Sequence, residues 1–183
     1  TLGSSAVAAV TAAGKVCNFL ACPYDAMGST MATYGGQNVG AGKLERLDKG
    51  LGSCVILGAV YAVIAVLISV FGGGLLARLF VDGGEQEIIN QVRQFLIWNT
   101  AFYFPLALVN IVRFLIQGMG FASFAILAGV FEMIARSLAA LVLVPVIGFT
   151  GVCLGSPIAW IFADAFLIPA YFYVKKLLKK RRM

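Results

Sequence analysis

The sequence predicts an all-α protein, a polytopic integral membrane bundle of five transmembrane helices. Hydrophobic residues make up 61% of its 183 residues and charged residues only 12%, and the mean hydropathy is +0.94. So few charges cannot cover the surface of a soluble domain of this size. The apolar residues also form long runs, each able to supply the roughly 20 helical residues that cross a bilayer core. A lipid-facing surface follows from both observations.

The first two spans are predicted at about 6–34 and 51–77. The second contains no charged residue. The first is less regular, since four residues interrupt its apolar pattern: Lys15, Asn18, Pro23 and Asp25. Both are still long enough to cross a membrane.

Three further runs predict the remaining spans, at about 92–116, 121–147 and 152–175. The fourth span contains Glu132 and Arg136, and the fifth contains Asp164. A charge in the middle of a bilayer costs several kcal/mol on most estimates, so each of these three residues requires a physical explanation.

The basic residues predict the orientation of the chain. With five crossings, three basic segments fall on the same side: Lys43, Arg46 and Lys49 after the first span, Arg113 near the turn at Gly118, and the tail at 176–183 with Lys175 before it. Lys and Arg accumulate on the cytoplasmic side of membrane proteins. We therefore expect a multi-pass protein of the cell membrane with a cytoplasmic C-terminus and a basic cytoplasmic tail.

Five spans with a cytoplasmic C-terminus place Thr1 on the opposite side of the membrane. The chain has no basic segment followed by a short apolar core at its start, so it shows no signal peptide. An additional helix is expected upstream, and the chain is interpreted as a fragment.

Several other chemistries are excluded by the residues available. The sequence contains no histidine, so a Ser-His-Asp or Cys-His arrangement cannot form. The four cysteines form no CxxC pair, and they are interpreted as packing residues. The glycines before Lys43 do not make a phosphate loop, because Gln37 and Leu44 stand where that motif needs Gly and Ser or Thr. We expect no enzyme activity, cofactor or metal, and no nucleic-acid partner.

The charged residues of the last two spans are the first functional candidates. Glu132 precedes Arg136 by four residues, the favourable order for an ion pair along a helix. This pair is either a structural contact that neutralises itself or a gating or ion-coupling pair. Asp164 has no cation at helical spacing in its own span, so it must face a cavity, contact another helix or carry a proton.

Polar residues in the first and third spans complete the candidate pathway. Asp25 follows Pro23, which removes a backbone donor and disturbs the helix. Asn18 lies on the first span and can bond a ligand or another helix. The third span carries three polar residues at the spacing of one helical face, which suits either a cleft lining or helix packing: Asn99, Tyr103 and Asn110.

Several segments together resemble a family of membrane transporters. They are the glycine-rich run 32–43 with Glu45 and Arg46, the start at 2–9, the stretch 110–120, Phe131 and Glu132 with Arg136, and 148–151 with Pro157 and Trp160. In order and spacing they resemble one lobe of the MATE (multidrug and toxic compound extrusion) family. The most specific part is the loop that contains Gly36, Gln37, Asn38, Gly40 and Gly42.

The resemblance implies a fold and a function for the chain. It implies that residues 1–183 are the C-terminal lobe of a two-lobe transporter, incomplete at the N-terminus, which acts with a missing N-terminal lobe. It further implies efflux of a small organic substrate, often cationic, in exchange for sodium ions or protons. Two alternatives remain open, a lipid-linked precursor flippase of the same superfamily and a membrane packing module without transport activity.

Overall fold

The computed structural model describes residues 3–78 and 86–180, and everything said of the structure below concerns these residues. They form helices only, in the order α1 (Ser4–Gly40), α2 (Glu45–Arg78), α3 (Gln86–Ala101), α4 (Tyr103–Gly118), α5 (Ala122–Ile147) and α6 (Phe149–Lys180). The prediction of an all-α polytopic bundle is confirmed. Residues 181–183 of the predicted basic tail lie outside the described part of the chain.

Four of these helices are individually long and apolar enough to cross a membrane, namely α1, α2, α5 and α6. Helices α3 and α4 pass the same test only as a pair, and they are bent by 51° at the break between them. The predicted span over 92–116 is therefore present as a bent pair of helices and not as one continuous helix. The break has a local cause: Pro105 has no N–H, so the carbonyl of Ala101 loses its donor from the next helical turn.

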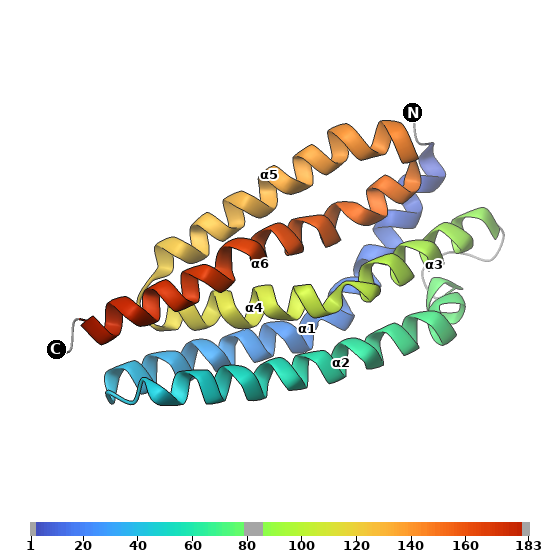
Figure 1. Ribbon diagram of the computed structural model, residues 1–183. Coiled ribbons are helices and arrows are strands. Elements are labelled where there is room, and N and C mark those ends of the chain that lie inside the picture. The colour runs from blue at the N-terminus through green and yellow to red at the C-terminus, as the bar shows by residue number, and fades with distance from the viewer. Residues whose placement is uncertain (1–2, 79–85, 181–183) are drawn as a thin grey trace.

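The helices run back and forth along a common direction (Figure 1). The α1–α2 turn, the α4–α5 turn and the C-terminal end of α6 lie at one end of the bundle, and the N-terminus lies at the other. Helices α5 and α6 pack side by side, while α1, α2 and α4 form the other side of the bundle. This arrangement agrees with the predicted alternation of crossings.

The outer faces of α2 and α5 are apolar. Large exposed side chains cover them: Ile56, Leu57, Val60, Val63, Leu67, Phe71 and Leu75 on α2, and Ile126, Leu127, Met133, Leu138, Leu141, Val142 and Val146 on α5. The inward face of α2 instead carries small residues at helical spacing: Cys54, Gly58, Ala62, Ala65, Ser69, Gly73 and Ala77. Small residues inside and large apolar ones outside are typical of helices packed within lipid, where close backbone approach supplies the contact.

Helix α4 lies close against α1 at Gly118, the last residue of α4. A Cβ atom added there would lie 2.0 Å from the carbonyl oxygen of Ala32 in α1. A backbone atom cannot move aside as a flexible side chain does, so the two helices would have to separate. Gly118 therefore sets the packing of α4 against α1.

We predict that Gly118→Ala destabilises the protein by the upper end of the about 1–3 kcal/mol typical of overpacking. Gly129→Ala is the matched control: it is also helical, and its added Cβ meets no atom within 4 Å. The control should be neutral or gain up to about 1 kcal/mol from helix propensity. Thermal melting of the detergent-solubilised protein tests both variants, and equal melting temperatures would contradict the prediction.

Candidate functional site

One side of α1 is polar along most of its length. Its residues recur every three or four positions, and all are exposed in the bundle: Thr11, Lys15, Asn18, Cys22, Asp25, Ser29 and Thr33. Some satisfy their own hydroxyl groups, since Thr11 and Ser29 donate to the backbone carbonyls four residues earlier. A hydrogen bond of this kind does not compensate the charges of Lys15 and Asp25. Charged side chains against lipid are costly, so this α1 polar stripe indicates a face that meets water or protein.

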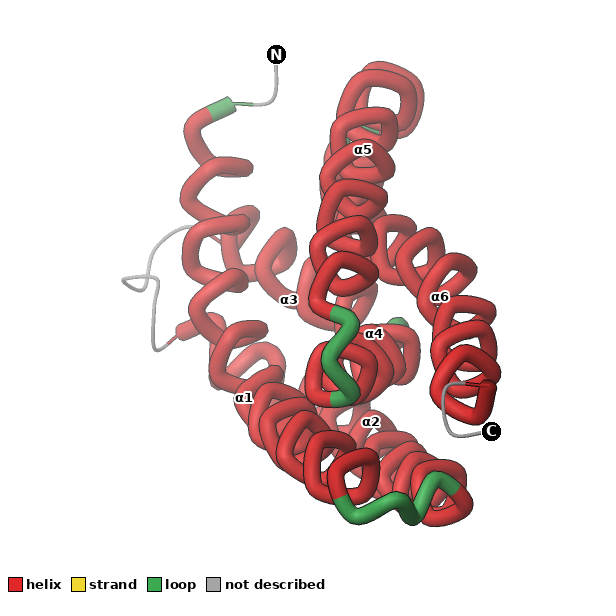
Figure 2. Tube along the Cα trace, turned by 90° about the vertical axis from the view of Figure 1, so that its left-hand side faces the viewer, coloured by secondary structure: helices red, strands yellow, loops and turns green. Residues whose placement is uncertain are grey.

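Beside this stripe, three adjoining cavities form a concave face that crosses the bundle from α1 to α5. The first has a volume of about 220 Å³ and lies between α1, α3, α4 and α6. The second, of about 280 Å³, shares Phe95 and Ser156 with the first and extends toward α5. The third, of about 340 Å³, lies along α5 and shares Arg136 and Ala140 with the second. Figure 2 shows the upper part of α1 standing apart from α5, with the other helices between and behind them.

The first cavity brings together three of the predicted pathway residues, Asn18, Asn99 and Tyr103. Asn99 is buried, and its amide nitrogen donates to the carbonyls of Phe95, at 3.0 Å, and Cys153, at 3.3 Å. These bonds tie α3 to α6 and leave the Asn99 side-chain oxygen as an acceptor.

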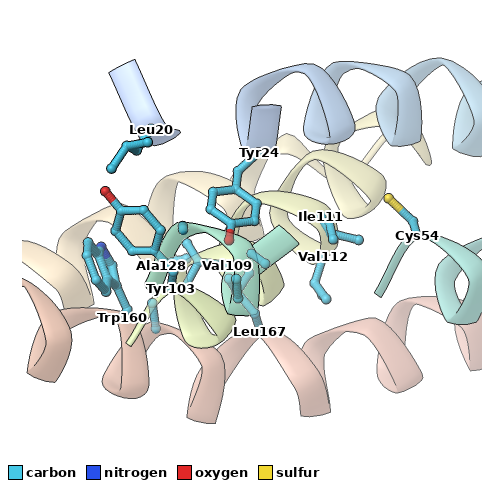
Figure 3. Close-up of a cluster of buried hydrophobic side chains, with 14 of the residues drawn as sticks. Leu20, Tyr24, Cys54, Tyr103, Val109, Ile111, Val112, Ala128, Trp160 and Leu167 are labelled. Atoms are coloured by element: carbon cyan, nitrogen blue, oxygen red, sulfur yellow. The ribbon is translucent and has the colours of Figure 1, made fainter. Parts of the chain in front are cut away.

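Tyr103 is held in the same cavity by aromatic contacts and one hydrogen bond. Its ring packs edge to face against Tyr24, with centroids 5.7 Å apart, and against Trp160, at 6.1 Å (Figure 3). Its hydroxyl donates to the carbonyl of Cys17 at 2.9 Å. The ring therefore forms part of a rigid wall, and this wall is suited to flat, partly apolar molecules.

Asn110 does not join this group. It does not line the first cavity, and its amide nitrogen donates to the carbonyl of Leu106, one turn earlier, at 3.2 Å. The expected single polar face of Asn99, Tyr103 and Asn110 is therefore not formed. The break at Phe102 places Asn99 on α3 and the other two residues on α4, so spacing along one straight helix does not describe them.

Four charged residues from three helices form a second group, here called the charge cluster: Arg113, Glu132, Arg136 and Asp164. Glu132 binds Arg113 of α4 directly, and its other oxygen lies 3.7 Å from a guanidinium nitrogen of Arg136. The predicted contact between Glu132 and Arg136 is thus present in α5, but it is the longer of two ion pairs that Glu132 makes. The principal partner of Glu132 comes from another helix, which no spacing within the fifth-helix run could indicate.

Asp164 lies in the same cluster and is 7% exposed. It has a side-chain oxygen, Oδ1, without a hydrogen-bond partner. Arg113 interacts with it electrostatically, and the Nε of Arg113 is likewise buried without a partner. Arg113 therefore binds Glu132 directly and acts on Asp164 through its charge.

Sequence reasoning treated Arg113 as a charge near a cytoplasmic turn and missed its role in this cluster. Its helix places it opposite α5 and α6, whose charged residues lie far away in sequence. The only available signal was that Asp164 and Glu132 each required a cation and that Arg113 lies within an apolar run.

The remaining candidates have simpler surroundings. Asp25 is exposed on the α1 polar stripe, and α1 continues through Pro23 without ending. In the glycine-rich motif, Gly42 has a positive φ of 78°, and Lys43 donates its N–H to the carbonyl of Asn38 at 2.8 Å. Gly36 lies against the carbonyl of Gly118. The motif Gly36, Gln37, Asn38, Gly40 and Gly42 thus ends α1 and allows close packing.

The described residues thus form a membrane-type helix bundle with a mostly apolar concave face and a charge cluster that includes one buried carboxylate, Asp164. The MatE family model matches residues 1–142 of the chain, and the protein belongs to the MatE family. No curated protein sequence matches it.

Comparison with solved structures supports the same fold. The chain is similar to a MOP superfamily transporter from Pyrococcus furiosus, with a TM-score of 0.81 and 18% sequence identity. The match covers 90% of this chain and 36% of that one, so the chain spans about a third of the transporter it resembles. No group of three metal-ligating side chains occurs among residues 3–78 and 86–180.

Proposed function

We propose that this chain is a lobe, the C-terminal one, of a secondary active efflux transporter that exchanges a drug or metabolite for sodium ions or protons by alternating access. One observation carries the proposal. A buried carboxylate, Asp164, with an oxygen lacking a hydrogen-bond partner, lies within an otherwise lipid-adapted bundle, where the charge of Arg113 acts on it. Because the chain spans 36% of the transporter it resembles, transport is proposed for the full-length protein.

The charge cluster provides a means of coupling. Arg113 on α4 binds Glu132 on α5, and its charge also acts on Asp164 on α6. The arginine therefore interacts with both carboxylates. A proton or sodium ion on either carboxylate weakens the attraction of Arg113 for that group and strengthens its relative preference for the other. Such a change biases the packing of α5 against α4 and α6, and an ion shifts a conformational equilibrium by its difference in affinity for the two states.

In this proposal, the first cavity binds part of the substrate. Its wall combines the rings of Phe95, Tyr103 and Trp160 with the amides of Asn18 and Asn99. A mostly apolar lining with a few fixed polar groups is the usual composition of a small-molecule site. We propose that a second lobe faces this surface and encloses the substrate.

The orientation in the membrane is part of the same proposal. The described basic residues at one end of the bundle are Lys43, Arg46, Lys49, Lys175, Lys176, Lys179 and Lys180. At this end, Asp48 binds Lys175 and accepts a hydrogen bond from Tyr171 at 2.8 Å, which joins α2 to α6. By the positive-inside rule this end is cytoplasmic, in the plasma membrane.

Transport by the full-length protein in proteoliposomes tests the proposal. Vesicles loaded with ethidium, a cation, or with taurocholate, an amphipathic anion, should export one of the two when an inward sodium or proton gradient is imposed, and the ion that drives export identifies the coupling ion. Movement of a lipid-linked precursor without ion-driven export of either solute would favour the flippase alternative. If none of these molecules moves, the packing-module alternative is favoured.

A further inference from the structure

We propose that Arg136 forms an anion-binding subsite on the concave face, so that the transported substrate is an amphipathic organic molecule bearing a negative charge. This inference rests on the proposed transport function and narrows its substrate class. It differs from the expectation of an often cationic substrate, which came from the family resemblance.

The surroundings of Arg136 leave its charge directed at the cavities. It lines both the second and the third cavity, and its side chain is 51% exposed, against 22% for Arg113 and 15% for Glu132. Glu132 is already bound by Arg113, and its contact with Arg136, at 3.7 Å, is the looser one. Glu132 therefore compensates the charge of Arg136 only in part, and the half-exposed guanidinium can still bind a further anion.

The rest of the lining suits an amphipathic anion. Glu132 is the one carboxylate among the residues that line the two cavities. Ser137 and Ser156 add hydroxyl donors on either side of Arg136, while Val10, Phe95 and Val144 provide an apolar wall. A guanidinium group with neighbouring hydroxyls binds a carboxylate or sulfonate, and the wall accepts the apolar body.

The depth of Arg136 argues against a lipid headgroup as the source of the anion. Arg136 lies at least about 16 Å along the helix axis from either end of α5. A side chain there cannot readily reach the headgroup region, although arginines near helix ends do so. An arginine at this depth requires water or a counter-charge within the protein, and the concave face supplies room for both.

Equilibrium binding to the purified full-length protein tests the subsite with two probes, radiolabelled taurocholate as an amphipathic anion and ethidium as a cation. Arg136→Gln should weaken taurocholate binding about tenfold or more, as expected for loss of a charge-assisted contact, and should leave ethidium binding unweakened. Arg136→Lys should lose less, because it keeps the charge but not the planar fork. Lys49→Gln, which removes an exposed cation at the end of the bundle, is the matched control and should bind taurocholate as the wild type does.

A second pair of variants keeps Arg136 in place. Ala140 lines both cavities one helical turn after Arg136. The carboxylate introduced by A140E can therefore form an ion pair with the guanidinium of Arg136. This variant should reduce taurocholate binding as strongly as R136Q. A140Q is similar in size but neutral and should have a smaller effect. This pair tests the subsite even if R136Q fails to fold.

Each outcome decides the inference. Taurocholate binding that is equal in the wild type and in both R136Q and A140E, or absent from the wild type, would overturn it. Loss of co-purified phosphatidylglycerol in R136Q without any change in taurocholate affinity would also overturn it, since the anion would then be a lipid. If taurocholate binding depends on Arg136 but ethidium and taurocholate are not transported, the subsite stands and the transport proposal fails.

Discussion

Asp164→Asn is expected to abolish or uncouple ion-driven efflux by the full-length protein while its expression stays normal. The side chain keeps its size, but it can no longer ionise or exchange a proton, and a buried acceptor oxygen without a partner becomes part of a neutral amide. If Asp164 is the group that binds the coupling ion, the two conformational states lose their difference in ion affinity, and the gradient no longer drives export. Export from proteoliposomes under the driving gradient, at equal protein content and with whichever of ethidium and taurocholate the wild type exports, measures this loss.

Glu45→Gln provides the control for the removal of a carboxylate. Glu45 is exposed in the first turn of α2, at the end of the bundle, and takes no part in the charge cluster. Its variant should transport as the wild type does. Unchanged ion-driven export in Asp164→Asn at equal expression would show that Asp164 is not the coupling group.

Arg113→Gln is expected to cost the protein about 3 kcal/mol of folding stability, the lower end of the range for breaking a buried ion pair by removing one partner, because Arg113 and Glu132 are 22% and 15% exposed. Glu132, at 15% side-chain exposure, would keep only the looser contact with Arg136. Asp164, at 7% exposure, would lose the cation that acts on it. One substitution thus leaves two carboxylates poorly compensated, and a lower melting temperature of the detergent-solubilised protein would report it.

Arg136→Gln is the matched control for this stability prediction. It removes the same functional group from the same cluster, but its side chain is half exposed and its distance from Glu132 is 3.7 Å. Its stability cost should stay below about 1 kcal/mol, as for exposed ion pairs. If the two arginine variants melt at the same temperature, the sharing of Arg113 between Glu132 and Asp164 is not what stabilises the cluster.

The amides and Tyr103 of the candidate site were only partly predictable. Asn18, Asn99 and Tyr103 were singled out because a polar side chain in a membrane helix needs a partner or a cavity, and the structure brings all three to one cavity. Asn110 was grouped with them by helical spacing alone. Helical spacing places residues on one face only if the helix is straight. The bend of 51° between α3 and α4 means that this condition is not met here.

The sequence by itself determined the class of the protein and the approximate positions of its membrane spans. Long apolar runs with few charges can only be accommodated by membrane helices, because every backbone polar group in lipid must bond within its own helix. These are local properties, so composition and periodicity suffice to read them. Because Glu132, Arg136 and Asp164 lie within these apolar runs, the sequence also showed that their charges must be compensated inside the membrane.

Only the tertiary structure decided how these charges are compensated and which surface is hollowed. The pairing of Arg113 with Glu132 joins α4 to α5, and the concave face is assembled from α1, α3, α4, α5 and α6. Such contacts depend on the packing of helices that are distant in the chain, and small residues such as Gly118 set how closely those helices approach. Spacing within one helix carries no information about the neighbour that it meets across the bundle.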